Sequence, residues 1–113
     1  MEPRFGKLNT PLIIQMLTIL YQNLDNNGGW VQGVQVHPWE TRGTTIPDIM
    51  RRIRRIARFR GFIETKNVRR HSYMRITPQG LEYLKYKGYI NSDQLEEAKK
   101  KLEWNKMLSH PLE

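Results

Sequence analysis

The chain has 113 residues, no cysteine and a formal net charge of +8 at pH 7. This length favours one compact domain, and apolar residues at 38% are enough to bury a core, which excludes a disordered polymer. The lack of cysteine excludes disulfides, Cys-containing zinc sites and thiol catalysis. Because the N-terminus lacks the apolar core of a signal peptide and no apolar run reaches the roughly 20 residues of a bilayer span, we expect a cytoplasmic protein without a membrane partner.

The positive charge is concentrated in the middle of the chain. Between Arg42 and Arg75 lie ten Arg and one Lys, whereas the only acidic residues there are Asp48 and Glu64. A local excess of this kind favours a polyanionic partner such as a nucleic acid.

The first predicted element is a helix that follows a short tail over residues 1–9. Thr10 can cap it, Pro11 fits its first turn, and the sequence Asn-Asn-Gly-Gly at 26–29 supplies a stop. Its apolar stripe is wider than one buried face needs. Either a dimer partner or terminal segments of the same chain must therefore cover it.

Residues 30–43 are predicted to form an extended segment or short strand, followed by a loop or a poorly formed short helix. Apolar and polar residues alternate at the start of this segment, and Pro38 interrupts any helix. Trp30 and Trp39 could serve as stacking platforms for single strands. We favour the alternative that both belong to the core, because large aromatic side chains dominate core packing.

The segment 45–60 is predicted to be a helix with one apolar and one basic face. Thr45 can cap it, Pro47 fits its first turn, and Gly61 ends it. At about 100° per residue, apolar residues such as Ile53 and Ala57 share one face.

Arginines cover the opposite face of this helix. Arg51, Arg55 and Arg58 point away from the apolar face, and Arg52 and Arg54 flank them. Like charges at this spacing destabilise a helix, so a bound anion is the simplest explanation, and phosphate matches the guanidinium fork. A merely solvated face would mix charge signs, and a membrane-surface helix would need exposed bulky apolar residues on its other face.

A hairpin and two more helices complete the predicted elements. Strands are expected over 62–66 and 71–77, joined by a polar turn at 67–70. A helix then opens at Thr77-Pro78 and is closed by Gly88.

The final helix, over 91–111, is capped by Asn91 or Ser92 and carries a narrow apolar stripe. It either packs on its own domain or projects as a dimerisation arm. Because the first helix is unusually apolar, we expect a homodimer.

The order of these elements, with the segment "ITPQGLEYL" after the hairpin, resembles that of winged-helix (winged helix-turn-helix) DNA-binding domains. The resemblance covers approximately Leu12 to Leu84. It implies an α+β fold with a helical core, a β-hairpin wing and an extra C-terminal helix. The domain would span 10–90, the extra helix 91–111, and residues 112–113 match a tag scar.

The resemblance also implies DNA-binding residues. Those expected to face the major groove are Thr44, Thr45, Asp48, Arg51, Arg52 and Arg55. Those expected on the wing, against backbone phosphates or the minor groove, are Lys66, Arg69, Arg70 and His71. The remaining expected phosphate contacts are Arg42, Arg54, Arg58 and Arg75.

One departure from the pattern leaves alternatives open. A winged helix normally has a positioning helix before its recognition helix, and "VQGVQVHPWETRG" is a poor helix sequence. The stretches "HPWETRGTTIP" and "RRHSYMRITPQGLEYL" are similar to the winged-helix domain shared by a eukaryotic small-subunit ribosomal protein and plectin. That branch implies RNA or protein binding, and a third alternative is a winged helix whose arginines meet an acidic protein.

No catalytic chemistry is expected. His37, His71 and His110 lie far apart in the sequence without clustered acids, and neither a phosphate-binding glycine loop nor a carboxylate pair is recognisable. The sequence therefore predicts a protein without a metal or cofactor that binds duplex DNA selectively as a homodimeric transcriptional regulator.

Overall fold

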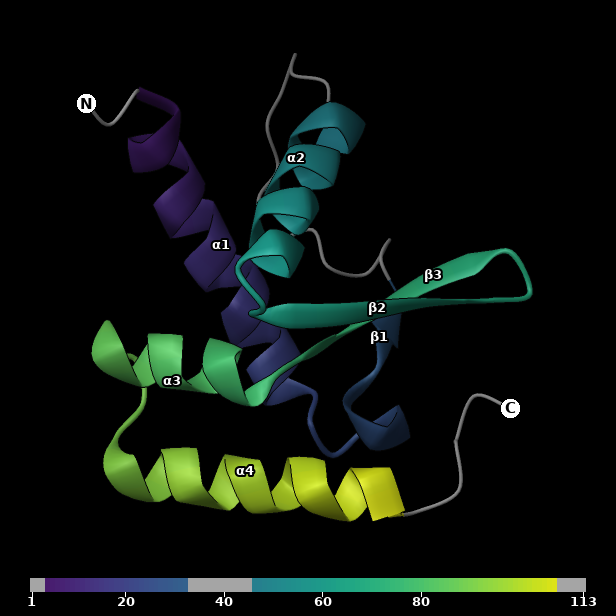
Figure 1. Ribbon diagram of the computed structural model, residues 1–113, viewed down its shortest axis with the longest axis vertical. Helices are drawn as coiled ribbons and strands as arrows, with labels where there is room; N and C mark the ends of the chain where they lie inside the picture. The colour runs from purple at the N-terminus through teal and green to yellow at the C-terminus, as the bar shows by residue number, and fades with distance from the viewer. Residues whose placement is uncertain (1–3, 33–45, 108–113) are drawn as a thin grey trace.

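The computed structural model describes residues 4–32 and 46–107 (Figure 1). Within these ranges the fold is α+β, with four α-helices and a three-stranded antiparallel sheet. The elements in chain order are α1 (Arg4–Gln22), the 3-10 turn η1 (Asn27–Gly29), β1 (Val31–Gln32), α2 (Ile46–Phe59), β2 (Ile63–Val68), β3 (His71–Ile76), α3 (Pro78–Tyr86) and α4 (Ser92–Met107).

The sheet has the strand order β1-β3-β2. β2 and β3 form the predicted hairpin, in register from Ile63 opposite Ile76 to Val68 opposite His71. The alternation after Trp30 predicts a short strand, and β1 is that strand. It pairs with β3, with Val31 opposite Met74. The part of that segment beyond Gln32 lies outside the described residues.

Helix α1 is the centre of the core. Ile13, Met16, Leu17 and Leu20 are almost completely buried. Helices α2 and α3 and strand β3 all contact α1. The same chain therefore covers this part of the apolar stripe, but with α2, α3 and β3 rather than with the terminal segments that were predicted.

The predicted start of α1 is wrong. The helix begins at Arg4 and contains Pro11, so residues 4–9 are helical rather than a tail. A proline removes one backbone hydrogen bond and favours a kink, but it does not oblige a helix to begin there. The Thr-Pro pair is thus compatible with both starts, and local sequence could not distinguish them.

Two glycines end helices as predicted, through the same hydrogen-bond pattern. Gly61 has φ +77° and Gly88 has φ +86°, which are left-handed values that favour glycine. After α2, the amide of Phe62 donates to the carbonyl of Ala57, and that of Gly61 donates to Arg58. The equivalent pair closes α3, from Tyr89 to Leu84 and from Gly88 to Lys85. Both ends are Schellman motifs.

The predicted cap at Thr77 also connects α3 to the end of α2. Its hydroxyl accepts from the amide of Gly80 at 3.1 Å and donates to the carbonyl of Gly61. Its own amide donates to the carbonyl of Phe62 at 3.0 Å. A Cβ on Gly80 would overlap that carbonyl oxygen. These contacts hold the base of the hairpin against the end of α2.

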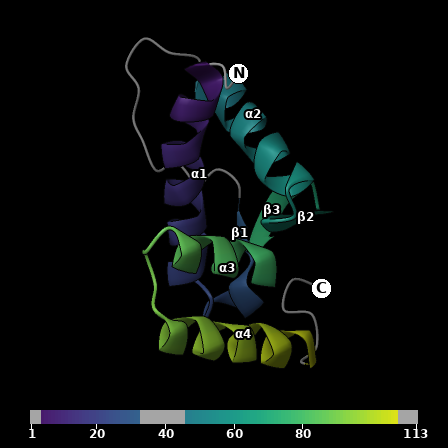
Figure 2. The same cartoon turned by 60° about the vertical axis from the view of Figure 1, so that its left-hand side comes forward.

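Helix α4 packs on its own domain and does not project. Leu95, Ala98 and Leu102 are buried against the layer formed by α3 and η1 (Figure 2). Asn91 caps the helix, because its side chain accepts from the amide of Gln94 at 2.8 Å. Of the two alternatives for this helix, packing on its own domain is the one that the structure shows, since its apolar stripe is buried within the chain. The described ranges hold no helix with the length and apolar character of a membrane span.

Candidate nucleic-acid interface

Helix α2 separates its apolar and basic residues as the sequence predicts. Ile53 and Ala57 are completely buried, whereas Arg51, Arg52, Arg55 and Arg58 are exposed. Thr44 and Thr45, predicted beside them, lie outside the described residues, and so does Arg42. The side chain of Asp48 is outside the described set as well.

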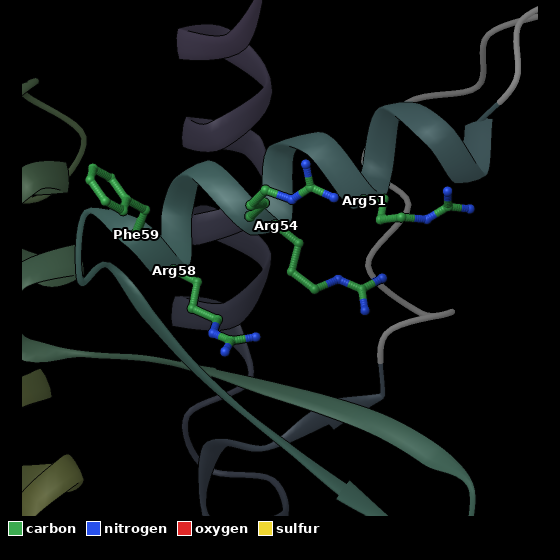
Figure 3. Close-up of a pocket in the computed structure, with 5 residues that line it drawn as sticks. Arg51, Arg54, Arg58 and Phe59 are labelled. Carbon is green, nitrogen blue, oxygen red and sulfur yellow. The ribbon is translucent and has the colours of Figure 1, made fainter.

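The basic face of α2 is hollowed. A depression of about 550 Å³ is lined by Arg51, Arg54, Arg55, Arg58 and Phe59. Figure 3 shows these side chains spread along the helix, with Phe59 at the end where the chain turns towards β2. We call this feature the arginine depression. Its guanidinium groups offer several parallel donors to an anion.

Arg54 connects the arginine depression to the sheet. It is only partly exposed, and its Nη1 donates to the hydroxyl of Ser72 on β3 at 3.3 Å. Burial, and then the charge of neighbouring Arg51, lowers the pKa of the Arg54 guanidinium. Its Nε atom is buried without a hydrogen-bond partner among the described residues. The folded state therefore disfavours the positive charge of Arg54, and an anion bound in the depression would stabilise that charge.

Two more arginines form the tip of the hairpin. Arg69 and Arg70 are exposed and make a two-residue turn with φ +50° and +72°. This backbone matches a type I′ turn, which strongly prefers Asn-Gly. A left-handed conformation costs about 1 to 2 kcal/mol for a residue with a Cβ. The turn therefore places two guanidinium groups at the tip at the expense of backbone strain.

Lys66 and His71 lie on the other face of the hairpin. Because side chains alternate along a strand, Ser72 and Met74 face the helices while Lys66 and His71 face away. The Lys66 ammonium lies 4.8 Å from the centre of the Trp30 ring, and the Nδ1 of His71 shares a hydrogen bond of 2.9 Å with Gln32. The structure does not bring these two residues together with the arginine depression.

The prediction that Arg75 contacts phosphate at the surface is wrong, because this side chain is buried. It is only 7% exposed, and its guanidinium stacks 4.4 Å from the centre of the Trp30 ring. It also pairs with Glu64 at 3.0 Å and donates to the carbonyl of Gly28 at 3.1 Å. Contacts from distant parts of the chain therefore satisfy this charge, and we remove Arg75 from the candidate interface.

Trp30 is a packing residue, as predicted. It is buried between Arg75 and Lys66, so its ring is not available for a base to stack on. Trp39, for which the same prediction was made, lies outside the described residues.

Sequence reasoning missed Phe59. This side chain is 90% exposed, the most exposed of the large apolar residues that the structure describes. A signal was present in the sequence, because Phe59 lies four residues after Arg55 and therefore on the basic side of α2.

The described residues do not form a metal centre. No three of the chain's His, Asp or Glu side chains gather where they could hold a metal ion, within the ranges that the structure covers. Comparison with protein-family models, with curated proteins and with solved structures found no match. The chemistry of the arginine depression and the hairpin tip is therefore what indicates a partner.

Proposed function

We propose that this protein is a winged-helix regulator of transcription that binds duplex DNA, with α2 in the major groove. The observation that carries the proposal is the stripe of exposed arginines along α2. The 14 residues of α2 make a rod about 21 Å long. With side chains an α-helix is about 10–12 Å in diameter, so it fits into a major groove about 12 Å wide.

The basic residues divide into two roles in this proposal. Arg51, Arg52 and Arg55 would read base edges, since arginine binds guanine through two parallel hydrogen bonds. Arg54 and Arg58 would bind phosphates on either side of the groove. These roles agree with exposure, because Arg54 is held partly buried against Ser72 and has less freedom to reach a base.

The hairpin would act as the wing. Its strands of six residues extend about 20 Å, and Figure 1 shows them leading away from the base of α2. Arg69 and Arg70 at the tip would bind backbone phosphates or the adjoining minor groove. Lys66 and His71 would take part only where the DNA also reaches the outer face of the hairpin.

The element order supports the winged-helix interpretation. A helix, a short strand, a second helix, a hairpin and a third helix follow in the order that the resemblance implies. The residues 33–45, where a positioning helix would lie, are outside the described ranges. A cytoplasmic homodimer stays a prediction from the sequence, and sedimentation of the purified protein would test its oligomeric state.

Fluorescence anisotropy tests the proposal with three labelled probes: a random-sequence DNA duplex, an RNA hairpin and a single strand, each at two salt concentrations. We expect tight, salt-sensitive binding to the duplex. A clear RNA preference would instead support the ribosomal branch, and no binding at low salt would indicate an acidic protein partner.

A matched pair of variants controls for net charge. Arg55→Ala with Arg58→Ala removes two charges from α2, and Lys100→Ala with Lys106→Ala removes two exposed charges from α4. The first pair should flatten the slope of log affinity against log salt concentration by about one unit, because in this proposal Arg58 binds a phosphate and Arg55 reads a base edge. The second pair should change binding little, and equal losses from both would contradict a specific role for α2.

A further inference from the structure

The exposure of Phe59 calls for an explanation beyond duplex binding. An aromatic side chain buries about 150–250 Å² when it is covered, so an exposed ring forgoes a large hydrophobic contribution. Phe62, three residues later, shows the usual outcome, since it packs on the core and stacks with Tyr83 at 4.5 Å between ring centres. Phe59 instead stays 90% exposed beside the arginines.

The surroundings of Phe59 restrict what could cover it. The ring lines the arginine depression together with Arg51, Arg54, Arg55 and Arg58. The depression has a volume of about 550 Å³, which is in the range of small-ligand sites. An apolar protein surface on this ring would also have to desolvate guanidinium groups, at a cost in free energy. A nucleotide fits both parts, because its base offers a flat ring to stack and its phosphate offers an anion.

Only some nucleotides have a free face. A base pair inside a duplex is stacked on both sides, whereas an unpaired base beside the duplex can stack on an aromatic side chain. We propose that Phe59 and the arginine depression bind an unpaired base, so that the preferred ligand is a DNA duplex that continues into a single strand. This inference rests on the proposed duplex binding and specifies its ligand.

Other exposed aromatic residues do not share this setting. Tyr86 is 81% exposed on α3, but the ammonium of Lys87 already lies 5.6 Å from the centre of its ring. Trp104 is 60% exposed on α4, away from the arginine depression. Tyr86 therefore supplies a matched control, as an aromatic side chain of similar exposure at a different site.

The experiment compares three DNA probes with the same duplex. One is blunt, one carries a single-stranded extension with bases, and one carries an abasic extension with equal numbers of phosphates. Single-stranded extensions at the 3′ end and at the 5′ end of the duplex are tested separately. By anisotropy, the base-containing extension should bind about 5- to 100-fold more tightly than the abasic one for at least one polarity.

Variants assign that difference to the ring. Phe59→Ala should abolish the preference for the base-containing extension, Phe59→Leu should lose most of it, and Tyr86→Ala should retain it. Circular dichroism of each variant verifies the fold. Equal affinity for the two extensions in the wild-type protein, or a preference that survives Phe59→Ala, would overturn the inference.

The blunt duplex separates this inference from the proposed function. If the wild-type protein binds the blunt probe and Arg55→Ala weakens that binding, duplex recognition stands whatever the extensions show. If no probe binds in a salt-sensitive manner, both the duplex proposal and the inference about Phe59 fail.

Discussion

The arginine depression and the outer face of the sheet are both rich in cations, but their cations have different surroundings. On the sheet, Arg75 is enclosed by Trp30, Glu64 and the carbonyl of Gly28, so its charge is used within the fold. On α2, Arg55 and Arg58 are exposed along a depression lined by further arginines. The surroundings of a charge, more than the local count of basic residues, therefore identify a candidate binding surface.

Replacing Arg75 should have the largest effect, and it should act on stability. Arg75→Ala leaves Glu64 and the Gly28 carbonyl without their shared donor and uncovers Trp30. We expect the free energy of unfolding to fall by about 2 to 3 kcal/mol, as measured by urea denaturation. Arg75→Lys should recover only part of this loss, because an ammonium cannot reproduce the planar contacts.

The matching measurement for Arg75 is the DNA affinity of the folded variant. It should equal that of the wild-type protein at a temperature where both are folded. A variant as stable as the wild type, with weakened DNA binding, would show that the two regions have been assigned the wrong way round.

Replacing Arg55 should have the opposite signature. Arg55→Ala should weaken binding to a selected preferred duplex by about 1 to 3 kcal/mol and reduce discrimination between sequences. The free energy of unfolding should stay constant or rise by about 0.3 kcal/mol, because a like-charged neighbour on the helix is lost. Titration of preferred and random duplexes provides the measurement, and uniform weakening on both would remove the base-reading role.

Replacing the two arginines at the hairpin tip should raise stability and weaken DNA binding. Replacing Arg69→Asn together with Arg70→Gly supplies the pair that a type I′ turn prefers, so the free energy of unfolding should rise by about 1 to 2 kcal/mol. Binding to all duplexes should weaken, and the salt dependence should flatten by about one unit for each charge removed.

Lysines at both tip positions provide the control. Arg69→Lys with Arg70→Lys keeps both the charges and the strained backbone, so it should retain most of the affinity without gaining stability. If the variant with Arg69→Asn and Arg70→Gly binds DNA as tightly as the wild-type protein, the hairpin does not act as a wing.

Replacing Arg54 should change stability only slightly. Because burial and Arg51 lower the pKa of Arg54, its charge is disfavoured in the folded state. Arg54→Met removes that charge and keeps much of the side-chain volume, so the free energy of unfolding should rise slightly, by less than about 0.5 kcal/mol. Thermal denaturation at neutral pH measures it, and a clear loss of stability would mean that the bond to Ser72 dominates.

Local sequence predicted the elements well where the governing interactions are local. Gly61 and Gly88 end helices, Thr77 and Asn91 cap them, and the two faces of α2 follow from residues three and four apart. The start of α1 was predicted wrongly because its local signals are ambiguous: Thr10 and Pro11 suit either the start or the interior of a helix.

Part of the candidate interface was also readable from the sequence. The exposed arginines of α2 and the two at the hairpin tip are where the pattern predicts them. Arg75 could not be removed by sequence reasoning, since its partner at Gly28 lies 47 residues away along the chain. Phe59 was overlooked although its spacing from Arg55 was available, because exposure of a ring depends on whether the rest of the fold covers it.

The sequence by itself determined a small basic α+β protein, the separation of charge from apolar residues on α2, and the ends of its later helices. These properties depend on composition and on neighbours within one helical turn. Only the tertiary structure decided which cations remain at the surface, which side of α1 the chain itself covers, and that α4 packs on its own domain. Those outcomes depend on contacts between residues far apart in the sequence, whose burial and hydrogen bonding exist only once the chain has folded.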